Sequence, residues 1–510
     1  MPRYAAIDIG SNSVRMQTAE VLPGTPARIL AADREVTRLG SSVFRTGLVS
    51  QDAMTFVCQV LARMAETYRK FDVHGVRAVA TAAIRDASNQ AEFIQRASEA
   101  AGTRVEVISG PEEARLIHLG VQSSWPHPDK RILIIDVGGG SAELILSESG
   151  ILREGVSRPL GAVRLSEVFL KSDPPQEVEL LRMEEFIEEK LQQVLRRINV
   201  FGFDRTIATS ASAAAVVCAI NRIPRARREE ADHLRATVSQ LRKFYREMSG
   251  STLAQRKKAV GVGPRRAELI VAGAAVFLKV LEMFNTPSLY YSTAGVRDGI
   301  IADLTARGVG RERSRLSREQ LRSVEAMSRK FGVTPKHGRR VADIAHALFE
   351  CLQPVHKLAP NDGKLLEAAA YLHDTGHYIS DTGHHKHSEY LVVNSDLPGF
   401  TSQERQLVAQ LCRYHRKSVP NAKHLPFQAL PAESKRTITS LMPVLRLADA
   451  LDTSREQRVE EVQCQLTPAG LAVNVKAGPK ADLELWAGER TSELFRQVYG
   501  LNLNMSRVKR

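Results

Sequence analysis

The sequence has little of what stabilises secreted or membrane proteins. Its five cysteines are scattered and form no CxxC pair, which argues against a disulfide framework and a cysteine-type zinc site. The longest apolar stretch, 271–284, is interrupted by Lys279 and is too short to span a bilayer. Residues 2–10 lack the apolar segment of a signal peptide. We therefore expect a soluble, cytoplasmic protein that does not bind membranes.

Acidic residues are also fewer than basic ones. The 510 residues contain 71 Lys and Arg against 57 Asp and Glu, a formal net charge of +14, which predicts a polyanionic partner. Between Arg222 and Arg266, 13 Lys and Arg accompany four Asp and Glu. Only Phe244 and Tyr245 supply aromatic rings there, which disfavours stacking on nucleic-acid bases. A phosphate-rich substrate, with no specific nucleic acid, fits this pattern better.

The chain changes character about two thirds of the way along. At roughly 100–200 residues per domain, its length predicts about three domains. β-rich runs alternate with helical patterns up to about residue 300, which indicates an α/β fold, and helical periodicity then continues to about residue 455. The expected strands are 4–9, 76–80, 105–108, 132–136, 144–146, 459–466 and 471–475. The expected helices in the first part are 54–71, 91–101, 180–200 and 266–284.

One pattern occurs twice. Residues 5–13 and 133–141 both read as an apolar strand, an Asp, one apolar residue, a Gly and a small polar turn, and Asp8 and Asp136 occupy equivalent places. Small residues let backbone N–H groups approach a phosphate closely, and the Asp can hold a divalent cation. Two such turns at domain spacing predict two related lobes around one ligand. The predicted phosphate-binding residues are Gly10, Ser11, Asn12, Ser13, Gly138, Gly139, Gly140 and Ser141.

These motifs resemble a known family. DIGSNS and DVGGGSAEL are similar to the paired phosphate loops of the actin-like ATPase superfamily. Together with segments 80–89, 108–117, 160–165 and 292–299, they resemble the exopolyphosphatase / guanosine pentaphosphate phosphohydrolase (Ppx/GppA) family over residues 1–305. The resemblance implies two actin-like (ribonuclease H-like) lobes, 1–125 and 126–305, followed by a linker at 306–320. One departure is the Ala-rich segment 208–213, where the family has a Gly-rich turn, so we leave it out of the predicted site.

Two adjacent glutamates differ in their expected roles. Ser109 and Glu112 have the spacing of a capping box at the start of a helix, with Pro111 tolerated in the first turn. Glu113 has no such task and shares a helical face with apolar residues. The resemblance implies that Glu113 is the catalytic base, which would deprotonate the attacking water.

The remaining predicted residues of the lobes bind the cation and the phosphate. Asp8, Asp136 and Glu143 are the candidates for holding Mg²⁺ or another divalent cation in the lobe cleft. Arg85 could bind a phosphate with a bidentate fork, and Asn89 lies one helical turn further along.

The C-terminal third is rich in histidine. Ten of the 14 histidines fall between residues 337 and 424. Imidazoles and carboxylates on separate helices suit a divalent-metal site, and the order of these residues resembles the HD phosphohydrolase domain. We therefore expect an all-α HD-like domain at 321–458, which could hold a second metal, and a short mixed α/β tail at 459–510. The ligand candidates are His337, His373, Asp374, His387, His415 and Asp449.

The leading hypothesis is a metal-dependent exopolyphosphatase that releases terminal phosphate from inorganic polyphosphate. The alternative within the family is hydrolysis of the 5′-γ-phosphate of guanosine pentaphosphate (pppGpp). An actin-like sugar kinase or ATPase fits less well because the second-lobe turn is altered and because Glu113 and the flanking family motifs are present. A protein that senses polyphosphate or the nucleotide without turnover fits less well because Glu113 is present. The resemblance also implies a homodimer.

Overall fold

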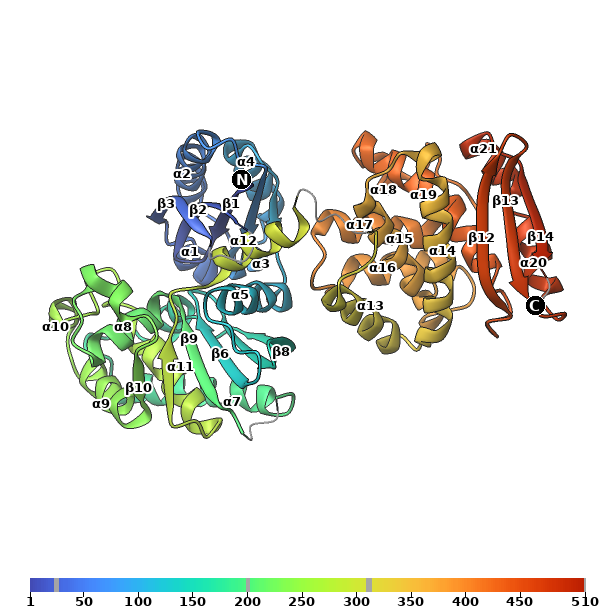
Figure 1. The fold of residues 1–510 in the computed structure, drawn as a ribbon. Helices are drawn as coiled ribbons and strands as arrows, with labels where there is room; N and C mark the ends of the chain where they lie inside the picture. The colour runs from blue at the N-terminus through green and yellow to red at the C-terminus, as the bar shows by residue number, and fades with distance from the viewer. Residues whose placement is uncertain (23–26, 199–201, 309–313, 509–510) are drawn as a thin grey trace. The chain divides into compact units, whose positions relative to one another are not determined.

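The computed structural model describes residues 1–22, 27–198, 202–308 and 314–508. The chain divides into two compact units, Met1–Val309 (unit 1) and Gly310–Arg510 (unit 2). Figure 1 shows unit 1 from blue to yellow and unit 2 from yellow to red. Part of the predicted linker at 306–320, residues 309–313, lies outside the described residues.

The first lobe of unit 1 contains a five-stranded sheet in the order β3-β2-β1-β4-β5. β1 pairs antiparallel with β2 and parallel with β4, so a meander is followed by crossover connections. The strands are β1 (Arg3–Ile9), β2 (Ser13–Glu20), β3 (Arg28–Val36), β4 (Gly75–Ala80) and β5 (Val105–Val107). The helices are α1 (Leu39–Thr46), α2 (Gln51–Arg69), α3 (Ala82–Asp86), α4 (Gln90–Ala101) and α5 (Gly110–Ser124).

The second lobe repeats this plan with a six-stranded sheet in the order β10-β11-β9-β6-β7-β8. Again an antiparallel meander, β6-β7-β8, continues into a parallel strand, β9. The strands are β6 (Arg131–Val137), β7 (Ala142–Glu148), β8 (Ile151–Arg158), β9 (Arg205–Thr209), β10 (Arg235–Thr237) and β11 (Ser288–Tyr291). The helical segments are α6 (Ala162–Phe169), α7 (Glu177–Leu195), α8 (Ser210–Ile220), η1 (Arg225–Ala231), α9 (Val238–Ser249), α10 (Leu253–Lys258), α11 (Ile270–Met283) and α12 (Val296–Arg307).

The expected helices begin and end close to their predicted positions, with two differences. The helix expected at 180–200 is α7, which ends at Leu195, and residues 199–201 lie outside the described part. The helix expected from residue 266 is α11, which begins at Ile270. Both predicted phosphate turns do follow the first strand of their lobe, β1 and β6.

Helix α12 departs from the simple division into 1–125 and 126–305. It packs against α5 and β1 of the first lobe, and its Ile300 and Ile301 share a hydrophobic cluster with Tyr4 and Ala6. The approach to α5 is close, because a Cβ on Gly299 would lie 1.7 Å from the carbonyl oxygen of Leu116. A larger residue at this position would push the two helices apart, so glycine allows the last helix of unit 1 to return to the first lobe.

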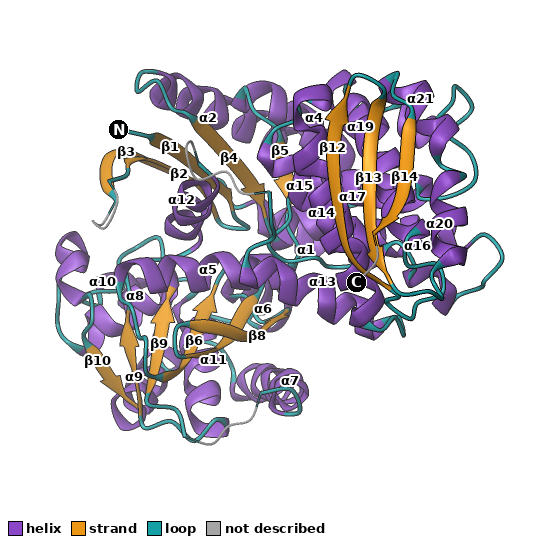
Figure 2. Cartoon of the chain, turned by 45° about the vertical axis from the view of Figure 1, so that its right-hand side comes forward, coloured by secondary structure: helices purple, strands orange, loops and turns teal. Residues whose placement is uncertain are grey.

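Unit 2 is helical and ends in a three-stranded sheet, with strand order β12-β13-β14. Figure 2 shows this sheet in orange beside the helices of the same unit. The helical segments are α13 (Arg318–Lys330), α14 (Pro335–His356), α15 (Pro360–Leu372), η2 (Thr375–Tyr378), α16 (His384–Asn394), α17 (Ser402–Tyr414), α18 (Leu425–Gln428), α19 (Ala432–Ala450), α20 (Asp482–Glu489) and α21 (Ser492–Tyr499). The strands are β12 (Val459–Thr467), β13 (Gly470–Ala477) and β14 (Leu503–Val508).

The predicted mixed tail, 459–510, shares the core of the helices. Val459, Val473 and Phe495 belong to the same hydrophobic cluster as Leu348 of α14 and Leu445 of α19. The two expected strands correspond to β12 and β13, and β14 adds a third strand parallel to β13. Among the described residues, no helix is both long and apolar enough to cross a bilayer.

Candidate active site

The two predicted phosphate turns have the same backbone geometry. The N–H of Gly10 donates to the carbonyl of Ser13 at 3.1 Å, and the N–H of Gly138 donates to the carbonyl of Ser141 at 3.0 Å. The turns also meet, because a Cβ on Gly139 would lie 2.9 Å from that of Ser11. Side chains at the turn glycines would therefore separate the two lobes here, and their absence lets both sets of backbone amides face one ligand.

Both turns line one cavity of about 700 Å³ in unit 1. The eight turn residues predicted to bind phosphate contribute to its lining, as do Asp8, Asp136 and Glu113, whereas Arg85 and Asn89 do not. A cavity of this size accommodates a ligand as large as a nucleotide.

Three carboxylates, Asp8, Glu113 and Asp136, line this cavity, and Glu143 lies close enough to raise the pKa values of two of them. Glu113 and Glu143 are buried, and Asp136 is 9% exposed. Burial, followed by the charge of Glu143, raises the pKa of Asp136 to about 8 and that of Glu113 well above its ordinary value. Burial also raises the pKa values of Asp8 and Glu143. Such a group of oxygen donors fits a hard divalent cation such as Mg²⁺, which would relieve the repulsion.

The neighbouring glutamates Glu112 and Glu113 face different surroundings. The Oγ of Ser109 accepts a bond from the N–H of Glu112 at 3.4 Å and caps α5. The Glu112 carboxylate accepts bonds from Arg115 at 2.8 Å and from Arg77 at 3.1 Å, within a buried ionic network. Glu113 instead lines the cavity. Glu112 therefore stabilises the helix that presents Glu113.

Arg85 and Asn89 lie in different places. Arg85 donates to the carbonyl of Ile108 at 2.7 Å and lies 3.5 Å from the Glu113 carboxylate, so it orients α5 and its glutamate. Asn89 bonds the backbone of Val49 through both its amide oxygen and its amide nitrogen. Neither Arg85 nor Asn89 belongs to the lining of the cavity. The prediction that Asn89 binds phosphate is therefore corrected, since its amide fixes a loop before α2.

Arginines form a second part of the cavity wall. The lining includes Arg15, Arg34, Arg225, Arg228, Arg266 and Arg297. Burial, together with the charges of the other arginines, lowers the pKa values of Arg34 and Arg266 to about 9. The Nε atoms of both have no hydrogen-bond partner among the described residues. Cations held this close to one another fit a polyanionic ligand.

Only part of this wall was foreseen from the sequence. Arg225, Arg228 and Arg266 belong to the basic stretch 222–266, whereas Arg15 and Arg34 come from strands of the first lobe. The turn left out of the prediction also lines the cavity, through Thr209, Ser210 and Ala211. Ser210 has φ +94°, a conformation that favours glycine, so this turn keeps a glycine-like backbone without the glycine.

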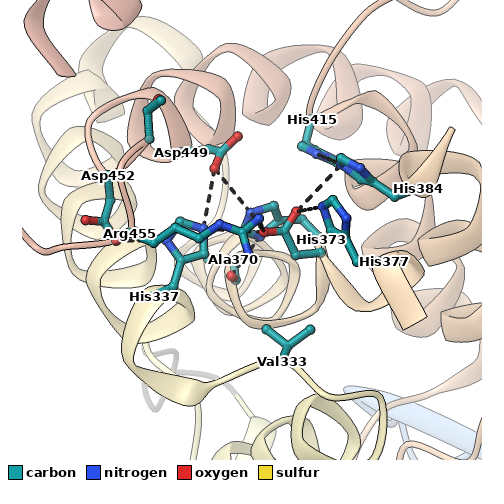
Figure 3. Close-up of polar contacts among 12 residues, drawn as sticks. Val333, His337, Ala370, His373, His377, His384, His415, Asp449, Asp452 and Arg455 are labelled. Atoms are coloured by element: carbon teal, nitrogen blue, oxygen red, sulfur yellow. Dashed lines mark hydrogen bonds and ion pairs between the residues drawn. The ribbon is translucent and has the colours of Figure 1, made fainter. Parts of the chain in front are cut away.

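Unit 2 brings together most of the predicted HD-like ligands. His337, His373 and Asp449 form one group whose ligand atoms lie within 4.8 Å of one another, and Asp374, His377 and His384 form a second. His415 adjoins the second group, with its Nε2 at 3.2 Å from that of His384. Figure 3 shows the histidines of both groups pointing toward one another.

The ligand set differs from the prediction in three residues. His387 lies outside both groups, and His384, the first residue of α16, belongs to the second group although it was not predicted. His377, which was also not predicted, lies in the one-turn segment η2, three residues after Asp374. An i, i+3 spacing from an expected ligand is the signal that could have identified it.

The unit 1 cleft combines groups that bind an anion with groups that bind a cation. Backbone amides and arginines bind anions, whereas the buried carboxylates need a cation, so the cleft suits a phosphate group together with a divalent metal. On two actin-like lobes, with an acid–base carboxyl group at the cavity, these features are those of a phosphohydrolase.

The comparisons with known proteins give the family. Residues 18–307 match the model described as the Ppx/GppA phosphatase family, and residues 320–484 match Ppx/GppA phosphatase, domain III. The chain belongs to the Ppx/GppA phosphatase family, whose members hydrolyse phosphoanhydride bonds.

Curated relatives match nearly the whole chain. A guanosine-5′-triphosphate,3′-diphosphate pyrophosphatase of Photobacterium profundum is 28% identical over 89% of this chain and 88% of its own. The protein of the same name from Vibrio vulnificus is 28% identical over 98% of this chain and 96% of its own. A crystal structure of the Aquifex aeolicus Ppx/GppA family member is 32% identical, covers 60% of this chain and 98% of its own, and has a TM-score of 0.53.

Proposed function

We propose that this protein hydrolyses the 5′-γ-phosphate of pppGpp, releasing phosphate and guanosine tetraphosphate. This substrate, which was the alternative in the sequence analysis, now takes precedence over polyphosphate. The observation that carries the proposal is the full-length similarity to relatives named for guanosine-5′-triphosphate,3′-diphosphate. The lining of the cavity also supports it, because one part is formed by the phosphate turns and carboxylates and another part by arginines.

The cavity has one part that suits the reacting phosphate and another that suits a distant one. The turns and Glu113 form the first part, where the 5′-triphosphate would lie. Burial, followed by the charges of Arg15, Arg225 and Arg228, lowers the pKa of Arg34, and these arginines form the second part. A nucleotide with phosphates at both its 5′ and 3′ positions can neutralise both parts at once, which GTP cannot.

The reaction needs one water molecule. Glu113 would accept a proton as the water oxygen attacks the γ-phosphorus, and the bond from that phosphorus to the bridging oxygen breaks. The leaving diphosphate oxygen carries away the electron pair, and the products are guanosine tetraphosphate and inorganic phosphate. The amides of both turns would bind the equatorial oxygens. A Mg²⁺ held by Asp8, Asp136 and Glu143 would supply charge neutralisation.

The raised pKa of Glu113 supports its role as the base. In the cavity without a cation, the buried carboxyl group favours its protonated form. A divalent cation and the nearby Arg85 favour the ionised form, so Glu113 becomes a base when the cleft is loaded. Substrate and metal binding would thereby be linked to activation of the base.

The test compares four substrates under the same Mg²⁺ concentration: pppGpp, GTP, ATP and long-chain polyphosphate. We expect kcat/KM for pppGpp to exceed that for polyphosphate and for GTP by about tenfold or more, since a charged pair that is desolvated on binding contributes on the order of 1.5–3 kcal/mol. Glu113→Gln should reduce the rate about 100- to 10,000-fold, as expected for loss of a general base. Glu66→Gln, which alters an exposed glutamate of α2, is the matched control.

Two results would contradict the proposal. A higher kcat/KM for polyphosphate than for pppGpp would restore exopolyphosphatase as the function. Full activity of Glu113→Gln would remove this residue as the base. The cytoplasmic location and the homodimer expected from the sequence stay predictions.

A further inference from the structure

Arg164, the third residue of α6, has no task in the reaction proposed for unit 1. Its side chain is 21% exposed, and among the described residues it does not belong to the lining of the cavity. We propose that Arg164 is a positioning residue, which fixes the amides of the second phosphate turn relative to Glu113. The inference rests on the proposed function only in requiring that unit 1 releases phosphate, whichever phosphoanhydride it prefers.

The second phosphate turn is held from behind by the start of α6. The first three backbone N–H groups of this helix donate to the carbonyls of Gly138 and Gly139, at 2.9–3.1 Å. In a trans peptide the N–H group points away from the carbonyl of the same plane. Carbonyls that face α6 therefore direct the amides that follow them, those of Gly139 and Gly140, away from the helix. Both of these residues line the cavity.

The third carbonyl of the turn, that of Gly140, is held by a side chain instead. The Nε of Arg164 donates to it at 2.8 Å. By the same geometry, this bond directs the amide of Ser141, which lines the cavity, away from α6. In the first turn the equivalent carbonyl, that of Asn12, accepts bonds from two backbone N–H groups, at 3.2 and 3.1 Å. The second turn therefore obtains from Arg164 a bond that the first turn obtains from the backbone.

The same guanidinium group reaches the first lobe. Its Nη2 lies 2.5 Å from Oδ2 of Asp86, the last residue of α3. The preceding residue, Arg85, donates to the carbonyl of Ile108 and lies 3.5 Å from the Glu113 carboxylate. Because α3 has five residues, a displacement of Asp86 also moves Arg85. Arg164 therefore connects the second turn to the side chain that holds the proposed base.

An aromatic ring of the first lobe fixes the guanidinium group between these partners. The Cζ of Arg164 lies 4.0 Å from the ring centroid of Phe44 on α1. A Cβ on Gly140 would lie 2.5 Å from the Cζ of Phe44, so the ring also lies close against the turn. Stacking on the ring restricts the guanidinium plane, whose fork can then hold Gly140 and Asp86 in fixed directions.

The position of Arg164 is unfavourable for its own helix. A cation in the first turn faces the positive end of the helix macrodipole. α6, all of whose residues the structure describes, has no acidic residue in its first turn and no side-chain cap to offset this charge. The contacts with Gly140, Asp86 and Phe44 compensate for it. We infer that this arginine serves the contact between the lobes rather than the stability of α6.

A second ion pair between the lobes provides a comparison. Arg38 and Glu268 lie 3.2 Å apart, and their side chains are 56% and 41% exposed. Among the described residues, the Glu268 carboxylate accepts no hydrogen bond from either phosphate turn. The variant Glu268→Gln therefore removes an ion pair between the lobes without freeing a carbonyl of a turn.

The test measures phosphate release by the full-length chain from pppGpp and from long-chain polyphosphate, at saturating Mg²⁺. Arg164→Met keeps the length of the side chain but removes both bonds. On the substrate that the wild type hydrolyses faster, we expect kcat to fall about 10- to 100-fold, because a displacement of about 1 Å can cost 100-fold. KM should change by less than about threefold, as expected when an interaction of the transition state is lost. Glu268→Gln, and Arg182→Gln at an exposed position of α7, should keep the wild-type kcat.

Two further variants separate the two bonds of Arg164. Arg164→Lys keeps the charge, but its ammonium group cannot reproduce the planar fork, so it should recover only part of the loss. Asp86→Asn leaves the bond to Gly140 in place and should lower kcat about two- to fivefold, as expected for one partly exposed ion pair. Asp86→Asn combined with Arg164→Met should be no slower than Arg164→Met alone, because both changes act through one contact.

A contact that only stabilises the fold would change the melting temperature and not kcat. Partly exposed ion pairs contribute little to stability, so unit 1 of Arg164→Met should melt within about 3 °C of the wild type. An equal loss of kcat in Glu268→Gln and Arg164→Met would overturn the proposal, since any link between the lobes would then suffice. A kcat within about threefold of the wild type in folded Arg164→Met would also overturn it, and so would a rise in KM at constant kcat. If circular dichroism shows that Arg164→Met is unfolded, wild-type kcat in both Arg164→Lys and Asp86→Asn would overturn it.

The substrate preference of the wild type tests the proposed function separately. A higher kcat/KM for polyphosphate would contradict the assignment of pppGpp, and the ratio of variant to wild type on polyphosphate would then decide the role of Arg164. A wild type that releases phosphate from neither substrate would overturn both proposals.

Discussion

The cleft of unit 1 and the histidine centre of unit 2 gather ionisable side chains of different kinds. The histidine centre is the set His337, His373, Asp374, His377, His384, His415 and Asp449. In the cleft, carboxylates such as Asp136 and Glu143 stand beside backbone amides and six arginines. In the histidine centre, five imidazoles and two carboxylates face one another. Arg455 contacts Asp374, and Arg416 contacts His384. The cleft therefore offers groups that suit a phosphate together with a hard cation, whereas the histidine centre offers mainly imidazole donors, which suit a transition metal.

This difference makes the two sites separable by experiment. Removing a carboxylate from the cleft should stop the chemistry of unit 1 and leave the metal ligands of unit 2 in place. Changing the buried packing of unit 1 should affect its stability alone, because the two units have separate hydrophobic clusters.

The largest effect is expected for Asp136→Asn. The amide keeps the size of the side chain but removes the charge that would hold the cation, so hydrolysis of pppGpp should fall about 1,000-fold. Phosphate release measured across a Mg²⁺ titration tests this, with Asp129→Asn at an exposed position as the control. Activity within tenfold of the wild type would show that Asp136 does not serve the cation.

The next effect concerns a buried network of arginines and carboxylates in unit 1. Asp303 on α12 contacts Arg115 at 2.8 Å and both Arg77 and Arg307 at 2.9 Å, and it is 5% exposed. Asp303→Asn leaves three guanidinium groups around a neutral amide. Removing one partner of a buried charge network costs about 3–5 kcal/mol, so unit 1 should unfold at a lower temperature.

Calorimetry would separate this change from any effect on unit 2. We expect the transition of unit 1 to move down in Asp303→Asn while that of unit 2 stays within a degree or two, and both should be unchanged in Asp129→Asn. A shift of both transitions together would show that the units unfold as one. No shift of either would show that the network contributes little.

The sequence predicted best what is local along the chain. The Asp–Gly turns, the cap of α5 by Ser109 and the position of Glu113 depend on spacings of a few residues, and the structure has these elements where they were expected. The arginine wall could not be predicted, because Arg34 on β3 and Arg225 on η1 meet only through the tertiary fold. The return of α12 to the first lobe depends on a long-range contact at Gly299, which leaves no periodic signal.

In unit 2 the sequence predicted a cluster of histidine and aspartate side chains but not all of the histidines that belong to it. His384 and His387 are one helical turn apart on α16, so spacing alone gives both a similar claim to be ligands. Only the three-dimensional structure distinguishes them, because it places His384, and not His387, in the group with Asp374 and His377. Asn89 was misplaced for a similar reason, since its bonds to Val49 join residues 40 positions apart.

The smallest expected effect is the pH dependence contributed by His118 in unit 1. This ring is 4% exposed, with its Nε2 2.9 Å from the Oγ of Ser147. Burial, with the charge of Arg115, lowers its pKa to about 4. Because the unfolded chain binds a proton near pH 6.5 and the folded chain does not, this contribution is complete above pH 6.5 and is lost as the pH falls toward 4.

At about 1.4 kcal/mol per pH unit, the wild type should lose about 2 kcal/mol of stability between pH 7.5 and 5 from this ring. His118→Gln keeps a polar partner for Ser147 but cannot titrate, so its unit 1 transition should fall less over the same range. As the pH falls, the unit 1 transition measured by calorimetry should therefore fall more in the wild type than in His118→Gln. The histidine centre offers the contrast, because bound metal would exclude protons from its inward nitrogens, and the unit 2 transition of metal-loaded protein should not respond to His118→Gln at any pH. Parallel pH profiles for wild type and His118→Gln would mean that the buried ring takes up its proton in the folded state as easily as in the unfolded chain.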